Sequence, residues 1–458
     1  MAIASVNPAT GITEREFAAH SDAEVDARIG QAHAAFLAMR GTGFAQRAAW
    51  MRAAADLLDA EADQVGAVLT AEMGKPLAQG AAEARKSART MRYYADHAEE
   101  FLTGRDLADP SAVNASAAWT RYEPIGVVLA VMPWNYPIWQ VVRFAAPALM
   151  AGNAGLLKHA SNVPQSALYL DSLFERGGFP PGAFRALLIP AARVEGVVRD
   201  RRVAAATLTG SEPAGRSLAA IAGSEVKHVV LELGGSDPFI VMPSADLDRA
   251  VALAVASRTT NNGQACINAK RFIVHAEAYE PFVERFTAAM AALVVGDPTD
   301  PATDIGPLAT ESGRAELAAL VDDALARGAA ATTGGAAPAG PGWFYPPTVL
   351  TGITESMRLY REEAFGPVAT VLRAADAEEA LRIANDTTFG LSSAVWTNDA
   401  DEEALLVAGI VAGAVFVNGM SISYPELPFG GTKDSGIGRE LAAEGIREFV
   451  NLKSVWKA

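Results

Sequence analysis

IGVVLAVM, residues 125–132, is the stretch of this 458-residue chain that decides its fold. A run this apolar is typical of a strand buried on both faces, as in a parallel sheet. The loop Pro133-Trp134-Asn135-Tyr136-Pro137 follows it, and residues 138–151 then show the apolar spacing of a helix. The uncharged stretch is nominally long enough to span a bilayer, but its prolines interrupt it. We therefore predict a buried strand, a loop and a helix.

The same alternation of apolar strands and helices continues toward the C-terminus. Four further apolar runs, separated by helical segments, lie at 155–158, 183–189, 204–209 and 228–233. This order predicts a βαβαβ unit with parallel strands, the architecture of nucleotide-binding domains. A second alternating region predicts a second α/β domain, with strands at 239–242, 271–275 and 368–372 and a helix capped by Asp246.

The remaining segments are helical or loop-like. Helical apolar stripes occur at 22–40, 44–71 and 76–102. The alternating residues 118–122 predict an exposed hairpin or an interface strand. Two segments rich in proline, glycine or alanine, 296–307 and 328–342, predict flexible loops.

Composition excludes several classes of protein. Lys and Arg number 38 against 53 Asp and Glu, a net charge of −15, so we expect no nucleic-acid partner and no binding to anionic membranes. Cys266 is the only cysteine and the six histidines are scattered, so we expect neither a disulfide scaffold nor a metal site. Residues 1–17 lack the basic and apolar regions of a signal peptide, and we expect a cytoplasmic protein.

Two side chains are candidates for covalent chemistry. Cys266 ends the polar loop 261–266, where a reactive group is commonly placed, although a lone cysteine is more often an inert buried thiol. Glu232 is the only carboxylate in the apolar strand 228–233 and precedes Gly234-Gly235, which lets a ligand approach closely. Burial raises the pKa of such a carboxyl, which suits a general acid or base; the alternative is a salt-bridged structural glutamate.

Two loops are candidates for binding. Asn135 can donate its amide N–H to an oxyanion under nucleophilic attack, or it can cap the helix that follows. Thr209-Gly210-Ser211 ends a strand and opens a helix, whose N-terminus attracts phosphate. The segment lacks a GxGxxG pattern, so it is a weak dinucleotide signal by itself.

Together these motifs resemble the aldehyde dehydrogenase superfamily. They occur in order over nearly the whole chain: Asn7-Pro8-Ala9-Thr10-Gly11, Pro133-Trp134-Asn135, Leu157-Lys158, Thr209-Gly210-Ser211, Glu232-Leu233-Gly234-Gly235, Gly263-Gln264-Ala265-Cys266, Glu362-Glu363-Ala364-Phe365-Gly366-Pro367-Val368, Pro428-Phe429-Gly430-Gly431 and Gly436-Ile437-Gly438-Arg439-Glu440. The resemblance implies an α/β fold with a Rossmann-like coenzyme domain, an α/β catalytic domain and a small β oligomerisation domain. The boundaries would be 1–105 with 123–234, then 235–431, and 106–122 with 445–458 for the oligomerisation elements of a homodimer or homotetramer.

The resemblance also assigns catalytic roles. Cys266 would attack the aldehyde carbon, and the Asn135 side chain with the Cys266 backbone N–H would stabilise the oxyanion. After hydride transfer to nicotinamide, Glu232 would activate the water that hydrolyses the thioester to a carboxylic acid.

Eight residues match the family's coenzyme site: Trp134, Lys158, Ser161, Gly210, Ser211, Leu233, Glu363 and Phe365. Lys158 would hold the adenosine ribose, Ser211 the pyrophosphate, and Glu363 with Phe365 the nicotinamide ribose. NAD-preferring members usually have Glu where this chain has Ser161. Without that carboxylate a 2′-phosphate is not repelled, so the resemblance implies that NADP is preferred and NAD possible.

The substrate side resembles the succinate-semialdehyde dehydrogenases within this superfamily, particularly a bacterial subgroup. Arg143, eight residues after Asn135, and Ser423 match the residues that hold the substrate carboxylate, although Arg143 can instead be a salt-bridged helix residue. Asn268 replaces the second cysteine of members with a disulfide switch, and Thr260 replaces an arginine that some of them carry. Other readings remain open: oxidation of glutarate semialdehyde or another short aldehyde, a CoA-acylating enzyme, or a catalytically silent member.

Overall fold

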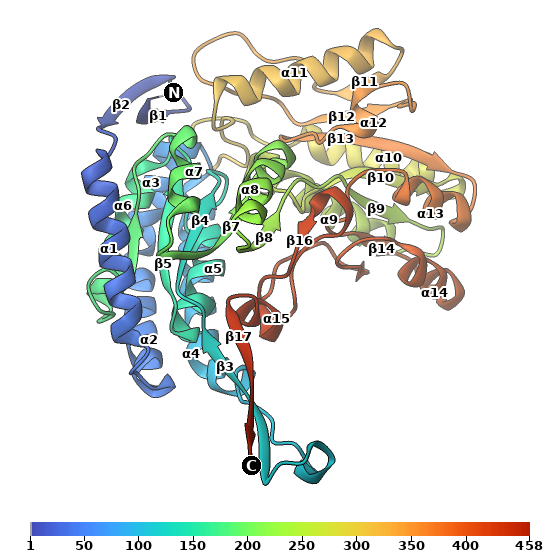
Figure 1. Ribbon diagram of the computed structural model, residues 1–458. Coiled ribbons are helices and arrows are strands. Elements are labelled where there is room, and N and C mark those ends of the chain that lie inside the picture. The colour runs from blue at the N-terminus through green and yellow to red at the C-terminus, as the bar shows by residue number, and fades with distance from the viewer. Residues whose placement is uncertain (1) are drawn as a thin grey trace.

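Two sheets of mainly parallel strands form the centre of the molecule (Figure 1). The structure is a computed structural model and describes residues 2–458. In spatial order, the six-stranded sheet contains β16 (Gly436–Ile437), β8 (His228–Glu232), β7 (Val203–Thr209), β4 (Val127–Met132), β5 (Ala154–His159) and β6 (Phe184–Ala186). The seven-stranded sheet contains β11 (Ala330–Thr333), β12 (Thr348–Thr351), β13 (Val368–Ala374), β10 (Ala269–His275), β9 (Asp237–Val241), β14 (Ala394–Trp396) and β15 (Phe416–Val417).

The six-stranded sheet confirms the predicted βαβαβ unit. Strands β4 to β8 are all parallel, and only β16 runs antiparallel at the edge. Residues 127–130 of β4 are fully buried, which explains their uninterrupted apolar sequence. The helices of this half are α1 (Asp22–Met39), α2 (Phe44–Ala60), α3 (Ala62–Met73), α4 (Leu77–Phe101), α5 (Trp139–Ala151), α6 (Pro164–Arg176), α7 (Val194–Arg199) and α8 (Glu212–Ser224), with short 3-10 turns at η1 (Pro110–Val113) and η2 (Ala191–Arg193).

The seven-stranded sheet forms the second α/β layer. Its strands alternate between two cores: Phe239 and Val241 of β9 pack on one face, and Ile240 packs on the other. Helices cover both faces, so the central strands β9 and β10 are almost entirely buried, whereas the edge strand β11 is exposed. The helices of this half are α9 (Leu247–Thr259), α10 (Ala276–Ala291), α11 (Glu311–Ala326), α12 (Arg358–Arg361), α13 (Ala377–Asn385) and α14 (Ala400–Gly409), with a 3-10 turn at η3 (Thr260–Gly263). The chain then returns to the first half, where a 3-10 turn at η4 (Lys433–Ser435) precedes β16 and α15 (Ala442–Arg447) packs against α4 and α5.

Two antiparallel ribbons complete the fold. β1 (Ile3–Asn7) pairs with β2 (Ile12–Phe17), and β3 (Ala117–Pro124) pairs with β17 (Val450–Lys457) over eight residues on each strand. The β3–β17 ribbon extends away from the two sheets at the bottom of Figure 1. The predicted hairpin near 118–122 is present, because the Leu107 N–H donates to the Ala118 carbonyl and the Thr120 N–H donates to the Arg105 carbonyl, both at 2.8 Å. The same segment also pairs with β17, the C-terminal segment that the resemblance grouped with it.

Two sequence predictions were wrong in detail. The predicted helix 44–71 is broken at Glu61 into α2 and α3, because the Glu61 carboxylate accepts a hydrogen bond from Tyr169 Oη (2.8 Å) and pairs with Arg176 on α6. The predicted loop 328–342 contains β11, an edge strand held by antiparallel pairing to β12. Neither contact has a local sequence signal. The boundaries of the three predicted domains remain a proposal.

The strand order places four loops side by side. Strands β8, β7, β4 and β5 are consecutive neighbours and parallel, so their carboxyl ends meet at one edge of the sheet. The chain reverses its direction of winding between β4 and β7, and such a reversal opens a crevice for ligands.

The uncharged stretch around residues 124–142 forms β4, the loop that follows β4 and the start of α5, as predicted. Within residues 2–458, no helix is long and apolar enough to cross a membrane.

Candidate active site

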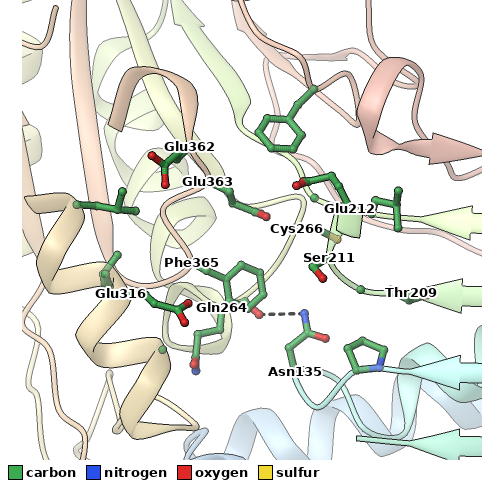
Figure 2. A pocket seen from close by; sticks show the side chains of 18 of the residues that line it. Asn135, Thr209, Ser211, Glu212, Gln264, Cys266, Glu316, Glu362, Glu363 and Phe365 are labelled. Carbon is green, nitrogen blue, oxygen red and sulfur yellow. Dashed lines mark hydrogen bonds between the residues drawn. The ribbon is translucent and has the colours of Figure 1, made fainter. Parts of the chain in front are cut away.

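A cavity of about 700 Å³ lies between the carboxyl edge of the six-stranded sheet and the second layer. It collects eight of the residues singled out from the sequence: Trp134, Asn135, Gly210, Ser211, Leu233, Cys266, Glu363 and Phe365. Figure 2 shows Cys266, Asn135, Ser211 and Glu363 directed at this common space from four separate segments. A cavity of this size suits a cofactor-sized ligand.

The loop carrying Cys266 is tightly turned and held by buried amides. Asn261 and Asn262 adopt left-handed backbone conformations (φ 60° and 57°), which asparagine tolerates better than most residues. The Asn262 side chain donates to the carbonyls of Gly74 and Pro307, both at 2.9 Å, and accepts from the Gly306 N–H. These bonds fix the loop between η3 and β10, and they place Cys266 at the cavity wall, partly exposed.

Asn135 is oriented to donate into the cavity. Its Oδ1 accepts from the Tyr136 N–H at 3.1 Å, which sets the amide plane, and its Nδ2 donates one hydrogen to the Gln264 carbonyl at 3.1 Å (Figure 2). An amide nitrogen carries two hydrogens, so one remains for a ligand. Asn135 does not cap the following helix, whose first residue is Trp139. This geometry favours the oxyanion role over the capping role.

A buried ion pair supports the Asn135 loop from below. Lys75 Nζ pairs with Glu83 and donates to the Asn135 carbonyl at 3.1 Å, and both side chains are 1% exposed. Glu83 Oε1 accepts from the backbone N–H groups of Ile138 (2.8 Å) and Trp139 (3.0 Å), which are unpaired donors at the start of α5. Glu83 therefore caps α5 from a distant helix.

The two expected catalytic groups have strongly perturbed acidities. Burial raises the pKa of the Cys266 thiol to about 12, while the positive charges of Arg143 and Lys270 act in the opposite direction. Burial, reinforced by the nearby Glu440, raises the pKa of Glu232 well above its usual range. Neither carboxylate oxygen of Glu232 has a hydrogen-bond partner among residues 2–458, which disfavours the structural salt-bridge alternative. Glu232 is 1% exposed and does not line the cavity wall.

The expected coenzyme residues divide into two groups. Ser211 precedes α8, but its side chain makes no capping bond, which leaves the hydroxyl available at the cavity. Glu363 forms an ion pair with Lys270 at 2.9 Å, and Lys270 also donates to the Ala265 carbonyl. Lys158 and Ser161 lie outside the cavity wall, in β5 and the loop that follows it. Ala160 of that loop and Trp134 both pack against a small buried cluster of Met73, Val163 and Ala309.

A second, smaller cavity of about 190 Å³ opens on the other side of Cys266. Arg143 and Ser423, the expected substrate residues, both line it, as does Lys86 of α4. Arg143 is 2% exposed, pairs with Glu440, and lies 4.4 Å from the Phe429 ring centroid. Arg143 therefore borders the cavity as expected, but it is also the salt-bridged residue of the alternative interpretation.

Four residues of the site were not predicted from the sequence: Lys75, Glu83, Lys86 and Lys270. Glu440 belonged to a quoted motif, although its pairing with Arg143 was not anticipated. A charged residue in an apolar run was the only available signal, and it applied to Lys270 in β10. Within the described part of the chain, no cluster of three or more His, Cys, Asp or Glu could hold a metal ion.

The model of the Aldehyde dehydrogenase family matches residues 1–455. The chain belongs to the aldehyde dehydrogenase family. A relative of this aldehyde dehydrogenase in Mycobacterium tuberculosis, succinate-semialdehyde dehydrogenase [NADP(+)] 1, is 64% identical over 458 residues and is covered completely, as is this chain.

Solved structures of other family members have the same fold. Succinic semialdehyde dehydrogenase from Streptococcus pyogenes, in complex with NADP+, is similar at a TM-score of 0.95 and 35% identity, with 99% of each chain covered. Succinate-semialdehyde dehydrogenase from Burkholderia pseudomallei is similar at a TM-score of 0.95 and 38% identity, covering 99% of this chain and 94% of its own. The expected α/β aldehyde dehydrogenase fold is thereby confirmed.

Proposed function

We propose that this aldehyde dehydrogenase oxidises succinate semialdehyde to succinate, with NADP as its preferred coenzyme and NAD as a weaker one. The observation that carries the substrate is the smaller cavity beside Cys266. Two cations, Lys86 and Arg143, line it, and no carboxylate does so within residues 2–458. A short aldehyde with a carboxylate at its far end fits this charge. The names of the similar mycobacterial and streptococcal proteins support the same substrate and coenzyme.

The larger cavity supports the coenzyme assignment. The free Ser211 hydroxyl at the N-terminus of α8 is a donor for a pyrophosphate, where the helix end also favours negative charge. Lys158 in β5 has a cationic side chain, and Ser161 in the loop after β5 has a neutral one. Neither position therefore carries a carboxylate that would repel a 2′-phosphate. We propose these three residues, with Trp134, Gly210, Leu233, Glu363 and Phe365, as the coenzyme site.

The proposed acylation uses the geometry around Cys266. The thiolate adds to the aldehyde carbon, and the second Nδ2 hydrogen of Asn135 with the Cys266 backbone N–H binds the resulting oxyanion. Arg143 and Lys270 favour the thiolate, because positive charge lowers the thiol pKa against the effect of burial. When bound, the coenzyme accepts the hydride that leaves the thiohemiacetal carbon, and a thioester at Cys266 remains.

The proposed deacylation is hydrolytic. Glu232 removes a proton from water, the hydroxide adds to the thioester carbon, and the Cys266 thiolate leaves as succinate forms. A carboxyl without a hydrogen-bond partner is free to accept that proton, and its raised pKa makes it a stronger base than an ordinary glutamate. The presence of this base favours water over CoA as the acyl acceptor, and the presence of Cys266 weighs against a catalytically silent protein.

Two broader properties belong to the same proposal. We propose a homodimer or homotetramer assembled through the β3–β17 ribbon, because Leu452 and Trp456 on it are more than half exposed. The single, unpaired cysteine supports a reducing, cytoplasmic location.

Steady-state kinetics with succinate semialdehyde and with butanal test the substrate. The two aldehydes have the same chain length and differ in the terminal carboxylate. We expect kcat/KM for succinate semialdehyde to exceed that for butanal by at least ~100-fold, because charge-assisted hydrogen bonds stabilise only the acid. Equal values would contradict the proposed substrate. We expect kcat/KM for glutarate semialdehyde to differ from kcat/KM for succinate semialdehyde by only ~10–200-fold, because one additional methylene changes discrimination by that factor.

A further inference from the structure

The smaller cavity contains a cation, Lys86, that forms no ion pair with any carboxylate of residues 2–458. Lys86 projects from α4, its Nζ donates to Ser423 Oγ at 2.9 Å, and it lies 4.1 Å from the centroid of the Trp139 indole. No carboxylate comes within ion-pair distance of Lys86 in the described residues. An ammonium has three N–H donors, so two of the three remain unused. A partly buried cation with unused donors is a site for an anion.

The other cation of the cavity is already neutralised. Arg143 pairs with Glu440, and both side chains are at most 5% exposed. Withdrawing Arg143 from Glu440 toward a substrate would leave a buried carboxylate unpaired, which is costly. The Phe429 ring, 4.4 Å from the guanidinium, further restrains Arg143. Arg143 Nη2 has no hydrogen-bond partner within residues 2–458, but the charge of Arg143 is matched by that of Glu440, so the positive charge that no carboxylate matches is that of Lys86.

We propose that Lys86, together with the Ser423 hydroxyl, binds the carboxylate of the aldehyde substrate, and that Arg143 instead holds Glu440 and favours the Cys266 thiolate. This inference rests on the proposed function, because it concerns a substrate with a terminal carboxylate. Ser423 Oγ accepts from Lys86, which leaves its own hydrogen free to donate to the same carboxylate. Lys86 and Ser423 come from α4 and from the loop after β15, so they meet only in the folded chain.

The surroundings of Lys86 make this binding sensitive to pH. Burial, together with the positive charges of Arg143 on α5 and Arg89 on α4, lowers the pKa of Lys86 to about 7, while Glu83 of α4 acts in the opposite direction. Cys266 and Tyr136 are the other titratable groups of the cavity wall, and burial raises the pKa of both, so they stay neutral near pH 7. A bound carboxylate favours the charged ammonium. Binding should therefore weaken as pH rises above about 7.

The decisive variant is Lys86→Met, which keeps the apolar stem over Trp139 and removes the charge. We expect the ratio of kcat/KM for succinate semialdehyde to that for butanal to fall ~30–100-fold, with the loss residing in KM rather than kcat. Lys86→Arg should restore at least a third of the ratio. The matched control is Arg89→Met on the same helix, whose exposed guanidinium pairs with Glu426; it should leave the ratio within twofold of wild type.

These measurements distinguish a failure of the Lys86 assignment from a failure of the proposed function. If wild type prefers succinate semialdehyde and Lys86→Met keeps that preference, the assignment of Lys86 is wrong and the proposed function stands. If wild type shows no preference, the proposed function fails and this inference fails with it.

A second measurement needs only the wild-type enzyme, so it stands even if the variants do not fold. Succinate carries the same carboxylate and should inhibit competitively against succinate semialdehyde. We expect its inhibition constant to rise about 25-fold between pH 6.5 and pH 8.5, because Lys86 with a pKa of about 7 loses its proton over this range. An inhibition constant that is flat with pH would overturn the assignment.

Discussion

At the scale of single residues, Glu232 shows how the fold alters a side chain's chemistry. It ends β8 facing Gly430, where an added Cβ would lie 2.7 Å from Glu232 Oε1, so only glycine leaves room for the carboxyl. Glu440 repels its negative charge, while Arg143 and Arg439 favour it. Burial has the largest effect of these, so the pKa of Glu232 rises. A carboxyl with a raised folded-state pKa stabilises the protein less as pH rises through that pKa.

Replacing this carboxyl should separate the two halves of the reaction. In Glu232→Gln the amide keeps the shape but cannot accept a proton, so we expect a burst of about one equivalent of reduced coenzyme per site, followed by turnover at least ~100-fold slower than wild type. Stopped-flow absorbance measures both phases. The thermal midpoint should not fall, because the substitution removes the carboxyl whose charged form is destabilised by burial. Unchanged steady-state turnover would contradict the role of Glu232 as base.

Coenzyme preference is expected to depend on one side chain in the loop after β5. Ser161→Glu introduces a carboxylate beside the proposed 2′-phosphate position, so we expect KM for NADP to rise about 100-fold by charge repulsion. KM for NAD should change less than fivefold, which makes NAD the internal control. Titration of coenzyme fluorescence quenching should report the same difference without turnover. An equal effect on both coenzymes would place Ser161 away from the 2′ position.

At the scale of secondary-structure elements, the start of α5 depends on α4. The loop 133–137 follows β4 directly, and α5 begins without a side-chain cap from its own residues. Glu83 supplies that cap, and its partner Lys75 binds the Asn135 carbonyl. The burial of Lys75 lowers its pKa, whereas Glu83 opposes this shift. The two helices thus stabilise each other's polar groups and align the proposed oxyanion donor.

Breaking this pair should cost stability as well as activity. Glu83→Gln leaves the Lys75 ammonium unpaired. We therefore expect the free energy of unfolding, measured with urea, to fall by ~3–5 kcal/mol. Removing both charges in Lys75→Met/Glu83→Gln should recover part of the loss. The control is Asp63→Asn, which breaks the exposed pair with Arg85 and should cost less than ~1 kcal/mol. Equal losses for the two single variants would contradict the argument from burial.

At the scale of the whole molecule, the β3–β17 ribbon is the element that lies farthest from either core (Figure 1). Apolar side chains of both strands border a surface groove there, among them Trp119, Tyr122, Leu452 and Trp456. Such residues are stabilised when a second copy of the chain covers them.

A charge placed in this groove should therefore prevent assembly. We expect Leu452→Glu to give monomers at micromolar concentration where wild type gives dimers or tetramers, as measured by size-exclusion chromatography with light scattering. Ile12→Glu is the matched control, because Ile12 is similarly exposed but lies on the separate β1–β2 ribbon. An unchanged mass for Leu452→Glu would move the interface elsewhere.

The sequence by itself determined the elements whose signals are local. Apolar runs located β4, β5, β7 and β8 to within about two residues, because a strand buried on both faces admits few polar side chains. Short motifs located Cys266, Asn135 and Ser211, since a tight loop or a helix start demands particular neighbours. These segments also formed the basis of the resemblance to the aldehyde dehydrogenases.

Only the tertiary structure decided which charges neutralise each other. Arg143 pairs with Glu440 rather than standing free, and Lys86 meets Ser423 across 337 residues of chain. Glu61 ends a helix through contacts with α6, and β3 pairs with β17 at the far end of the chain. Such contacts leave no periodic trace in sequence, because each depends on which elements pack together and not on the spacing of residues along one of them.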